Sequence, residues 1–216
     1  MKCSLRMDPF RLRTTIAAEP GEYDGYPMVS EARVSGMPLS VSPDRAAIGA
    51  VLCFSASISG SFAMDRGCSP QVSNAIRRWF DPADLHVMNI DFEPAARIEG
   101  NVVVRILAEG ANDTSSKAEG TPGEPVIHVA REGTGCLATA DHLAVVSNAW
   151  LLATPAGTLL ERMIPAIGIA VLFAEDLLAG TIAVPGVSAD RSQPLWSKLE
   201  TLLDATGLSL RAIEPH

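Results

Sequence analysis

The sequence predicts one α/β domain that contains two copies of the same supersecondary unit. Three windows of the first half recur in the second half, in the same order and at a nearly constant displacement. Strand-like and helix-like segments alternate in both halves, and one predicted helix in each half is apolar on every face. A repeat of this length indicates a duplicated unit. We therefore predict a single duplicated domain over residues 1–216, with repeat units at 9–107 and 126–216 and a flexible linker at 108–125.

The recurring windows share few identities, but apolar positions fall opposite apolar positions. Their common order favours an internal repeat over a chance similarity. The matching pairs are Ser30–Pro38 with Ser147–Pro155, Ala50–Met64 with Ala170–Val184, and Ser69–Phe92 with Ser192–Pro215.

The first unit is expected to run β-β-α-β-α-β. Ser42 and Ser69 each precede a proline, and serine at the N-cap with proline at the first helical position is a typical helix start. Apolar runs bounded by turn residues predict the strands. The four strands of this order are expected at Arg11–Ala17, Val29–Leu39, Ile58–Met64 and Leu85–Phe92, with helices at 42–57 and 69–80. A further strand is expected at Val102–Leu107, before the linker.

The second unit is expected to repeat this order after the linker. Residues 108–125 are small, polar or turn-forming, which is typical of a mobile linker. The expected strands are Val126–Ala130, Leu143–Ala153, Leu178–Val184 and Leu208–Ile213, with helices at Leu159–Asp176 and Ser192–Asp204.

The first helix of each unit is expected to be buried on all sides, whereas the second helices are amphipathic. Gly49 and Gly168 lie inside the two apolar helices, where glycine costs about 1 kcal/mol relative to alanine. A close helix–helix approach would offset this cost, and we predict one at these positions.

Composition and charge exclude several classes of function. A net charge of -8 and a pI near 5.0 argue against a nucleic-acid-binding surface. The most apolar stretch, Met163–Val184, contains Pro165, Glu175 and Asp176, whereas a membrane span needs about twenty apolar residues. The first residues lack the apolar run of a signal peptide. We expect a soluble, cytoplasmic protein with no nucleic-acid or membrane partner.

Cysteine and histidine give no metal or redox signature. The cysteines are Cys3, Cys53, Cys68 and Cys136. No pair of them has metal-ligand spacing or forms a readable disulfide framework, so no metal and no cofactor is expected. His128 and His142 belong to no recognisable catalytic motif, and Trp150 is interpreted as a packing residue.

Three segments resemble a known enzyme family. Arg162–Val184 runs from a proline-containing Ala/Val/Leu helix through Phe-Ala and Gly-Thr into a strand, and Asp190-Arg191 precedes the next helix. Ser40–Arg45 opens the first apolar helix. These segments resemble the EPSP synthase and UDP-N-acetylglucosamine enolpyruvyl transferase family. The family's lysine falls on Ser40, and its acid before the proline falls on Arg162, with Glu161 one position earlier.

The resemblance implies an inside-out α/β domain, in which sheets lie outside and buried parallel helices lie inside. Parallel helices would bring their N-termini together, where unpaired N–H groups and helix dipoles favour an anion. The resemblance then implies a substrate site and a general acid or base. The implied substrate-binding residues are Ser42, Asp44, Arg45, Asp190 and Arg191, and the implied catalytic residue is Glu161. Alternatively, the arginines are surface residues at helix starts, and Glu161 only favours a helix N-terminus.

Two functional hypotheses follow from the resemblance. In the first, the chain is an enolpyruvyl-transferase-like enzyme that binds phosphoenolpyruvate. Family members close two such domains on a cleft, so a second copy of this chain or a partner chain would complete it. In the second, the chain is a non-catalytic descendant that binds a small anion or a protein partner. A nucleic-acid end-processing role, as in the RNA 3'-terminal phosphate cyclases that share the general fold, is disfavoured by the net charge of -8.

Overall fold

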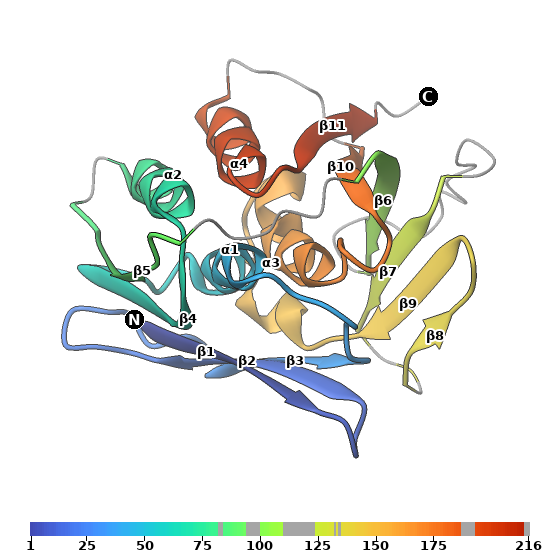
Figure 1. The fold of residues 1–216 in the computed structure, drawn as a ribbon, viewed down its shortest axis with the longest axis horizontal. Coiled ribbons are helices and arrows are strands. Elements are labelled where there is room, and N and C mark those ends of the chain that lie inside the picture. Colours follow the sequence, from blue (N-terminus) through green and yellow to red (C-terminus); the bar gives the residue numbers. More distant parts are fainter. Residues whose placement is uncertain are drawn as a thin grey trace.

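The computed structural model describes residues 1–81, 84–93, 100–109, 124–131, 133, 135–186 and 193–213. Within these residues the chain forms two mixed β-sheets and four α-helices, as the predicted α/β class requires (Figure 1). The first sheet contains β1 (Lys2–Asp8), β2 (Arg13–Glu19), β3 (Glu31–Ser35), β4 (Ser61–Cys68) and β5 (His86–Ile90). The second contains β6 (Val102–Ala108), β7 (Val126–Ala130), β8 (Leu137–Ala138), β9 (His142–Val146), β10 (Ala179–Pro185) and β11 (Ser209–Ile213). The helices are α1 (Pro43–Phe54), α2 (Pro70–Phe80), α3 (Leu159–Leu172), α4 (Pro194–Asp204) and a 3-10 turn, η1 (Ala149–Leu152).

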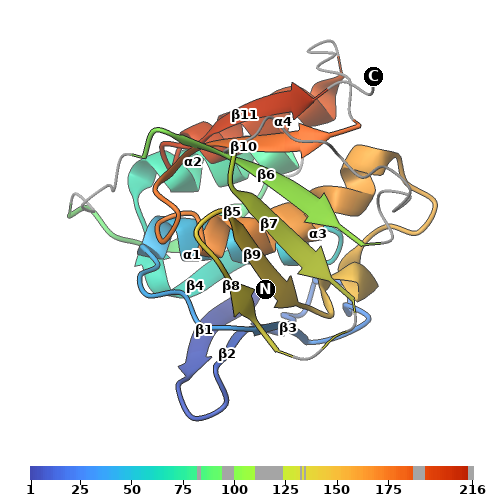
Figure 2. The ribbon, with the colours of Figure 1, turned by 90° about the vertical axis from the view of Figure 1, so that its right-hand side faces the viewer.

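The two sheets differ in strand direction. The five-stranded sheet has the order β3-β2-β1-β4-β5, and β2 runs antiparallel to both of its neighbours. The six-stranded sheet has the order β11-β10-β6-β7-β9-β8, and every neighbouring pair from β11 to β9 is parallel. The carboxyl ends of β6, β7 and β9 therefore lie side by side at one edge (Figure 2).

The sheets meet where β3 lies next to the end of β9 (Figure 1). The Asn148 side chain accepts a hydrogen bond from the Arg33 N–H at 2.7 Å and donates one to the Glu31 carbonyl at 2.9 Å. The Ser35 hydroxyl accepts one from the Val146 N–H at 2.7 Å. These bonds fix η1, which follows β9, against the first sheet.

The central helices α1 and α3 pack against each other between the sheets, while α2 packs on α4 (Figure 1). The predicted close approach is confirmed at their crossing. A Cβ atom added to Gly168 would lie 2.9 Å from the Gly49 carbonyl oxygen, and one added to Gly49 would lie 3.0 Å from the Gly168 carbonyl oxygen. Both glycines are needed because any side chain would push the helix backbones apart.

The expectation of parallel central helices is wrong for α1 and α3. Gly49 lies against Leu172 near the end of α3, whereas Cys53, near the end of α1, donates its S–H to the Pro165 carbonyl at 3.7 Å. Contacts thus move backward along α3 as they move forward along α1. This antiparallel arrangement sets each helix N-terminus beside the other helix's C-terminus, which their dipoles favour. It also separates the start of α1, which carries Arg45, from the start of α3, which carries Glu161.

Most element boundaries agree with the prediction, and the differences are local. α3 ends at Leu172, because the chain turns through residues 173–178 and Leu178 has a φ of 49°. The predicted strand at 143–153 is β9 followed by η1. β1 was not predicted. Strand β6, assigned to the first unit from sequence, pairs with β10 and β7 in the second sheet. Of the predicted linker, residues 110–123 lie outside the described residues.

Helix length and composition also bear on membrane insertion. In the described part of the chain, no helix is both long and apolar enough to cross a membrane.

Candidate functional site

The predicted anion site at the start of α1 is occupied by the protein's own carboxylates. Ser42 is the N-cap of α1, and its hydroxyl accepts a hydrogen bond from the Arg45 N–H at 3.4 Å. Arg45 is only 2% exposed, and its Nη1 lies 3.9 Å from Oε1 of Glu175, just beyond α3. Glu175 also accepts hydrogen bonds from the Ser40 hydroxyl at 2.7 Å and the Ser42 N–H at 3.0 Å. The Arg45 guanidinium is therefore committed to an internal ion pair.

The two acids after α3 have pKa values displaced in opposite directions. Burial opposes ionisation of Glu175, but the hydrogen bonds from Ser40 and Ser42 and the charge of Arg45 outweigh it, so its pKa lies below the ordinary value. Burial dominates at Asp176, and the neighbouring Glu175 charge adds to it, so the pKa of Asp176 is raised. Asp176 still accepts the Leu39 N–H at 3.0 Å. This polar cluster joins the start of α1 to the end of α3.

Asp44 has a similar internal role. It is 5% exposed, and its Oδ1 accepts a hydrogen bond at 2.6 Å from the N–H of Ser69, the N-cap of α2. Asp44 thus holds the starts of α1 and α2 together and does not face a ligand space.

Glu161 lies at the other end of the helix pair and stabilises the start of α3. Its side chain accepts the Thr158 N–H at 2.6 Å, and the Thr158 hydroxyl accepts the Glu161 N–H at 3.3 Å, which is a complete capping box. The structure does not bring Glu161 to Arg45. The remaining predicted residues, Asp190 and Arg191, lie outside the described residues.

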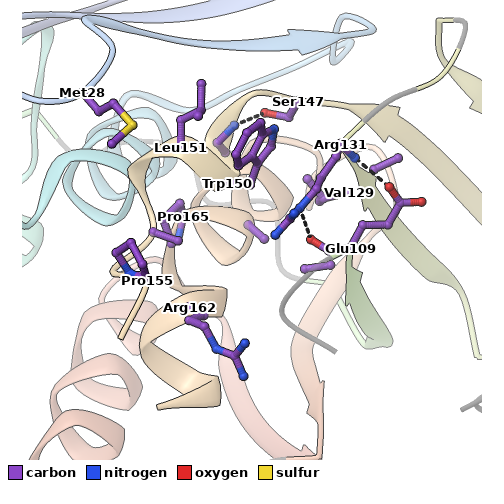
Figure 3. Close-up of a pocket in the computed structure, with 15 residues that line it drawn as sticks. Met28, Glu109, Val129, Arg131, Ser147, Trp150, Leu151, Pro155, Arg162 and Pro165 are labelled. Atoms are coloured by element: carbon purple, nitrogen blue, oxygen red, sulfur yellow. Dashed lines mark hydrogen bonds between the residues drawn. The ribbon is translucent and has the colours of Figure 1, made fainter. Parts of the chain in front are cut away.

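A cavity of about 370 Å³ opens where β6, β7 and β9 end. Parallel sheets typically bind ligands in the crevice outside the carboxyl ends of their strands. The wall on the strand side comes from residues at or just after these ends, and the opposite wall comes from η1 and the first turns of α3 (Figure 3). The lining residues are Met28, Ala108, Glu109, Val129, Ala130, Arg131, Ser147, Ala149, Trp150, Leu151, Ala153, Pro155, Arg162, Pro165 and Ala166.

Arg131 is positioned on the strand side of this cavity. It follows β7 directly, and its N–H donates to Oε2 of Glu109 at 2.9 Å, while its Nε donates to the Glu109 carbonyl at 3.1 Å. Its guanidinium lies 4.9 Å from the centre of the Trp150 ring, in a cation–π contact (Figure 3). These contacts hold the cation beside Trp150 on the strand side of the cavity (Figure 3).

Arg162 lies on the helix side of the same cavity (Figure 3). Among the described residues its buried Nε atom has no hydrogen-bond partner. Arg162 is also the fourth residue of α3, close to a helix N-terminus, where a positive charge is electrostatically unfavourable. A bound anion would satisfy the N–H group and offset the unfavourable charge.

Glu109 is the carboxylate of the cavity and is itself held in place. Its Oε1 lies 3.5 Å from Nε2 of His128, and the His128 ring stacks on His142 with centroids 6.2 Å apart. Neither histidine lines the cavity. Together with the Arg131 N–H, these contacts hold the carboxylate on the far side of Arg131 from Trp150 (Figure 3).

Sequence reasoning missed these residues, although signals for them exist. Glu109 and Arg131 are charged residues placed directly after parallel strands, where ligand-binding side chains are typically found. Arg162 occupies the position where the resemblance expects an acid, so the charge at that position is reversed. Trp150 packs against Arg131 at the cavity instead of serving only the core.

Metal-ligand geometry and similarity to known proteins give no further information about the ligand of this cavity. Within the described ranges, no group of three or more His, Cys, Asp or Glu side chains could hold a metal ion. Comparison of the chain with family models, with curated proteins and with solved structures finds no match in any of the three.

Proposed function

We propose that the protein binds a small organic anion in the cavity at the ends of β6, β7 and β9. A carboxylate or phosphate group would lie between Arg131 and Arg162. The observation that carries this proposal is the buried Nε of Arg162, which has no hydrogen-bond partner among the described residues. A buried donor without a partner costs about 1–3 kcal/mol, and hydrogen bonds to ionised groups are the strongest that could satisfy it.

Binding is better supported than group transfer. The residues that the resemblance assigns to catalysis and phosphate binding, Glu161 and Arg45, are held in a capping box and an internal ion pair. Glu109 is the carboxylate in the cavity, and it already accepts the Arg131 N–H. The enolpyruvyl-transferase-like reaction remains a second proposal. It is favoured by one feature, since phosphoenolpyruvate carries two anionic groups and the cavity presents two guanidinium groups.

We also propose that the fold is a duplicated unit. Apart from the edge strand β8, the strand orders β3-β2-β1-β4-β5 and β9-β7-β6-β10-β11 correspond in position, although β2 is antiparallel to its neighbours and β7 is parallel. The equivalent helices pack in pairs, α1 on α3 and α2 on α4. In this assignment the units begin at β1 and β6. The inside-out arrangement of the enolpyruvyl transferases, and a second chain that completes the cleft, remain part of the same proposal.

The binding proposal can be tested by calorimetry and thermal unfolding with inorganic phosphate, phosphoenolpyruvate and hexanoate. A ligand at 100 times its Kd should stabilise the protein by about 2.7 kcal/mol. Arg162→Gln and Arg131→Gln should each weaken binding at least about tenfold, since each removes a charge-assisted hydrogen bond. Arg33→Gln is the matched control, because Arg33 is exposed and pairs with Glu31 away from the cavity.

Two results would overturn the proposal. One is that none of the three anions binds to the wild-type protein. The other is that the binding constants are the same in Arg162→Gln as in the wild type. Conversion of phosphoenolpyruvate in the presence of a hydroxyl acceptor would favour the transferase proposal.

A further inference from the structure

The cavity has two features that together define a ligand, namely its apolar wall and its net charge. Apolar side chains make up most of the lining. Met28, Leu151, Pro155 and Pro165 gather on one side of Trp150 in Figure 3, and Arg131 lies on the other. Ligand sites with such walls bind molecules that bury a hydrocarbon body and use a few polar groups for orientation.

The charge of the lining favours a single negative group. Its charged residues are Arg131, Arg162 and Glu109, so the formal sum is one positive charge. A monoanion neutralises this sum. A second negative group at the other end of such a ligand would leave water and be buried against the apolar part of the lining. Burial of an unpaired charge in apolar surroundings is strongly unfavourable.

We infer that the ligand of this cavity is an amphipathic monocarboxylate, a small organic acid with one carboxylate group and an apolar chain or ring. This inference rests on the proposed function, because it assumes that the arginines bind the anionic group. The carboxylate lies between Arg131 and Arg162, and the apolar part packs on Trp150, Leu151 and Pro165. The apolar wall excludes a second negative charge, because the charge would be buried there without a partner.

The inference predicts how affinity depends on ligand chemistry. Burial of each added methylene group should tighten binding roughly fourfold until the apolar wall is filled. The neutral amide of the same chain should not bind detectably, since it lacks the charge. A dicarboxylate of equal length should bind at least about tenfold more weakly, because its second carboxylate would be buried unpaired against the apolar wall.

Calorimetric titration of the full chain with acetate, butanoate, hexanoate and octanoate tests the length dependence. Hexanamide and adipate, the six-carbon dicarboxylate, test the charge dependence. Arg162→Gln should abolish hexanoate binding, and Arg33→Gln should not change it. Thermal unfolding of each variant shows that it is folded.

The outcomes separate the inference from the proposed function. If phosphate or phosphoenolpyruvate binds in an Arg162-dependent way but affinity does not rise with chain length, the inference is wrong and the anion-binding function stands. The same holds if adipate binds as tightly as hexanoate in the wild type. If hexanoate binds equally well to Arg162→Gln, its site is elsewhere, and the inference fails. If no anion binds, the proposed function fails as well.

Discussion

Arg45 and Arg162 lie near the beginnings of the two central helices, but their surroundings differ. Arg45 is 2% exposed and lies against Glu175, with 3.9 Å between Nη1 and Oε1. Arg162 borders a cavity, and its Nε has no partner among the described residues. Within the same residues no carboxylate forms an ion pair with Arg162.

The contrast shows which of the two cations is available for a ligand. A buried charge requires a counter-charge inside the protein, and Glu175 supplies one to Arg45. A cation that breaks local electrostatic preference without such compensation is more typical of a binding site. We therefore expect Arg45 to serve stability, and the proposed function assigns Arg162 to binding. Four substitutions test this division, beginning with the one of largest expected effect.

Glu175→Gln should cause the largest loss of stability. The substitution preserves shape but leaves the buried Arg45 without its counter-charge, and breaking a buried pair in this way costs about 3–5 kcal/mol. The free energy of unfolding, measured with urea at neutral pH, gives the loss. Glu31→Gln is the control, because the exposed pair of Glu31 with Arg33 should contribute less than about 1 kcal/mol. Equal losses in the two variants would contradict the assignment of Arg45.

Gly168→Ala should have the next largest effect, because it forces apart the two helices that carry the arginines. The added Cβ would lie 2.9 Å from the Gly49 carbonyl oxygen and 3.0 Å from the Leu52 Cβ. Overpacking of this kind costs about 1–3 kcal/mol. Gly25→Ala is the control, since the nearest atom to its added Cβ is 3.5 Å away. A stable Gly168→Ala protein would show that the helix contact tolerates separation.

The parts of this fold that could be predicted from sequence are those with local causes. Ser42 and Ser69, each followed by proline, mark helix starts, because capping is decided within a few residues. Gly49 and Gly168 predicted a close helix approach, because glycine inside an apolar helix is costly unless packing offsets it. The antiparallel direction of the helices could not be predicted, since it depends on how both sheets close around them.

The cavity residues could not be predicted from sequence for the same physical reason, since they depend on how distant segments pack together. Arg131, Trp150 and Arg162 are brought to one cavity by a sheet edge, a 3-10 turn and a helix that are separate in sequence. Their arrangement depends on the order β6-β7-β9, and β6 was assigned to the other unit from sequence. The resemblance directed attention to Arg45, because it carries over positions but cannot show which charges are already compensated.

The acid dependence of stability should distinguish the two carboxylates near Arg45. Because the folded pKa of Glu175 lies below its ordinary 4.5, its contribution is fully present above that pH and is lost as pH falls through the folded value. The raised pKa of Asp176 acts oppositely, and its contribution is lost as pH rises through the folded value. Unfolding free energies measured from about pH 3 to pH 7 should therefore depend less steeply on pH in Glu175→Gln and more steeply in Asp176→Asn. The same slope in all three proteins would argue against this assignment.

Arg162→Gln should have the smallest effect on the ligand-free protein, and this makes it the sharpest test of the comparison. The substitution removes two unfavourable features, a cation near a helix N-terminus and a buried N–H group that has no hydrogen-bond partner within the part of the chain that the structure describes. We expect the free energy of unfolding to stay within about 0.5 kcal/mol of the wild type or to rise slightly. Urea unfolding without and with a saturating anion separates the two roles of the residue. A loss of several kcal/mol without ligand would make Arg162 a structural cation like Arg45, whereas unchanged stability with lost ligand stabilisation is the behaviour of a residue retained for binding.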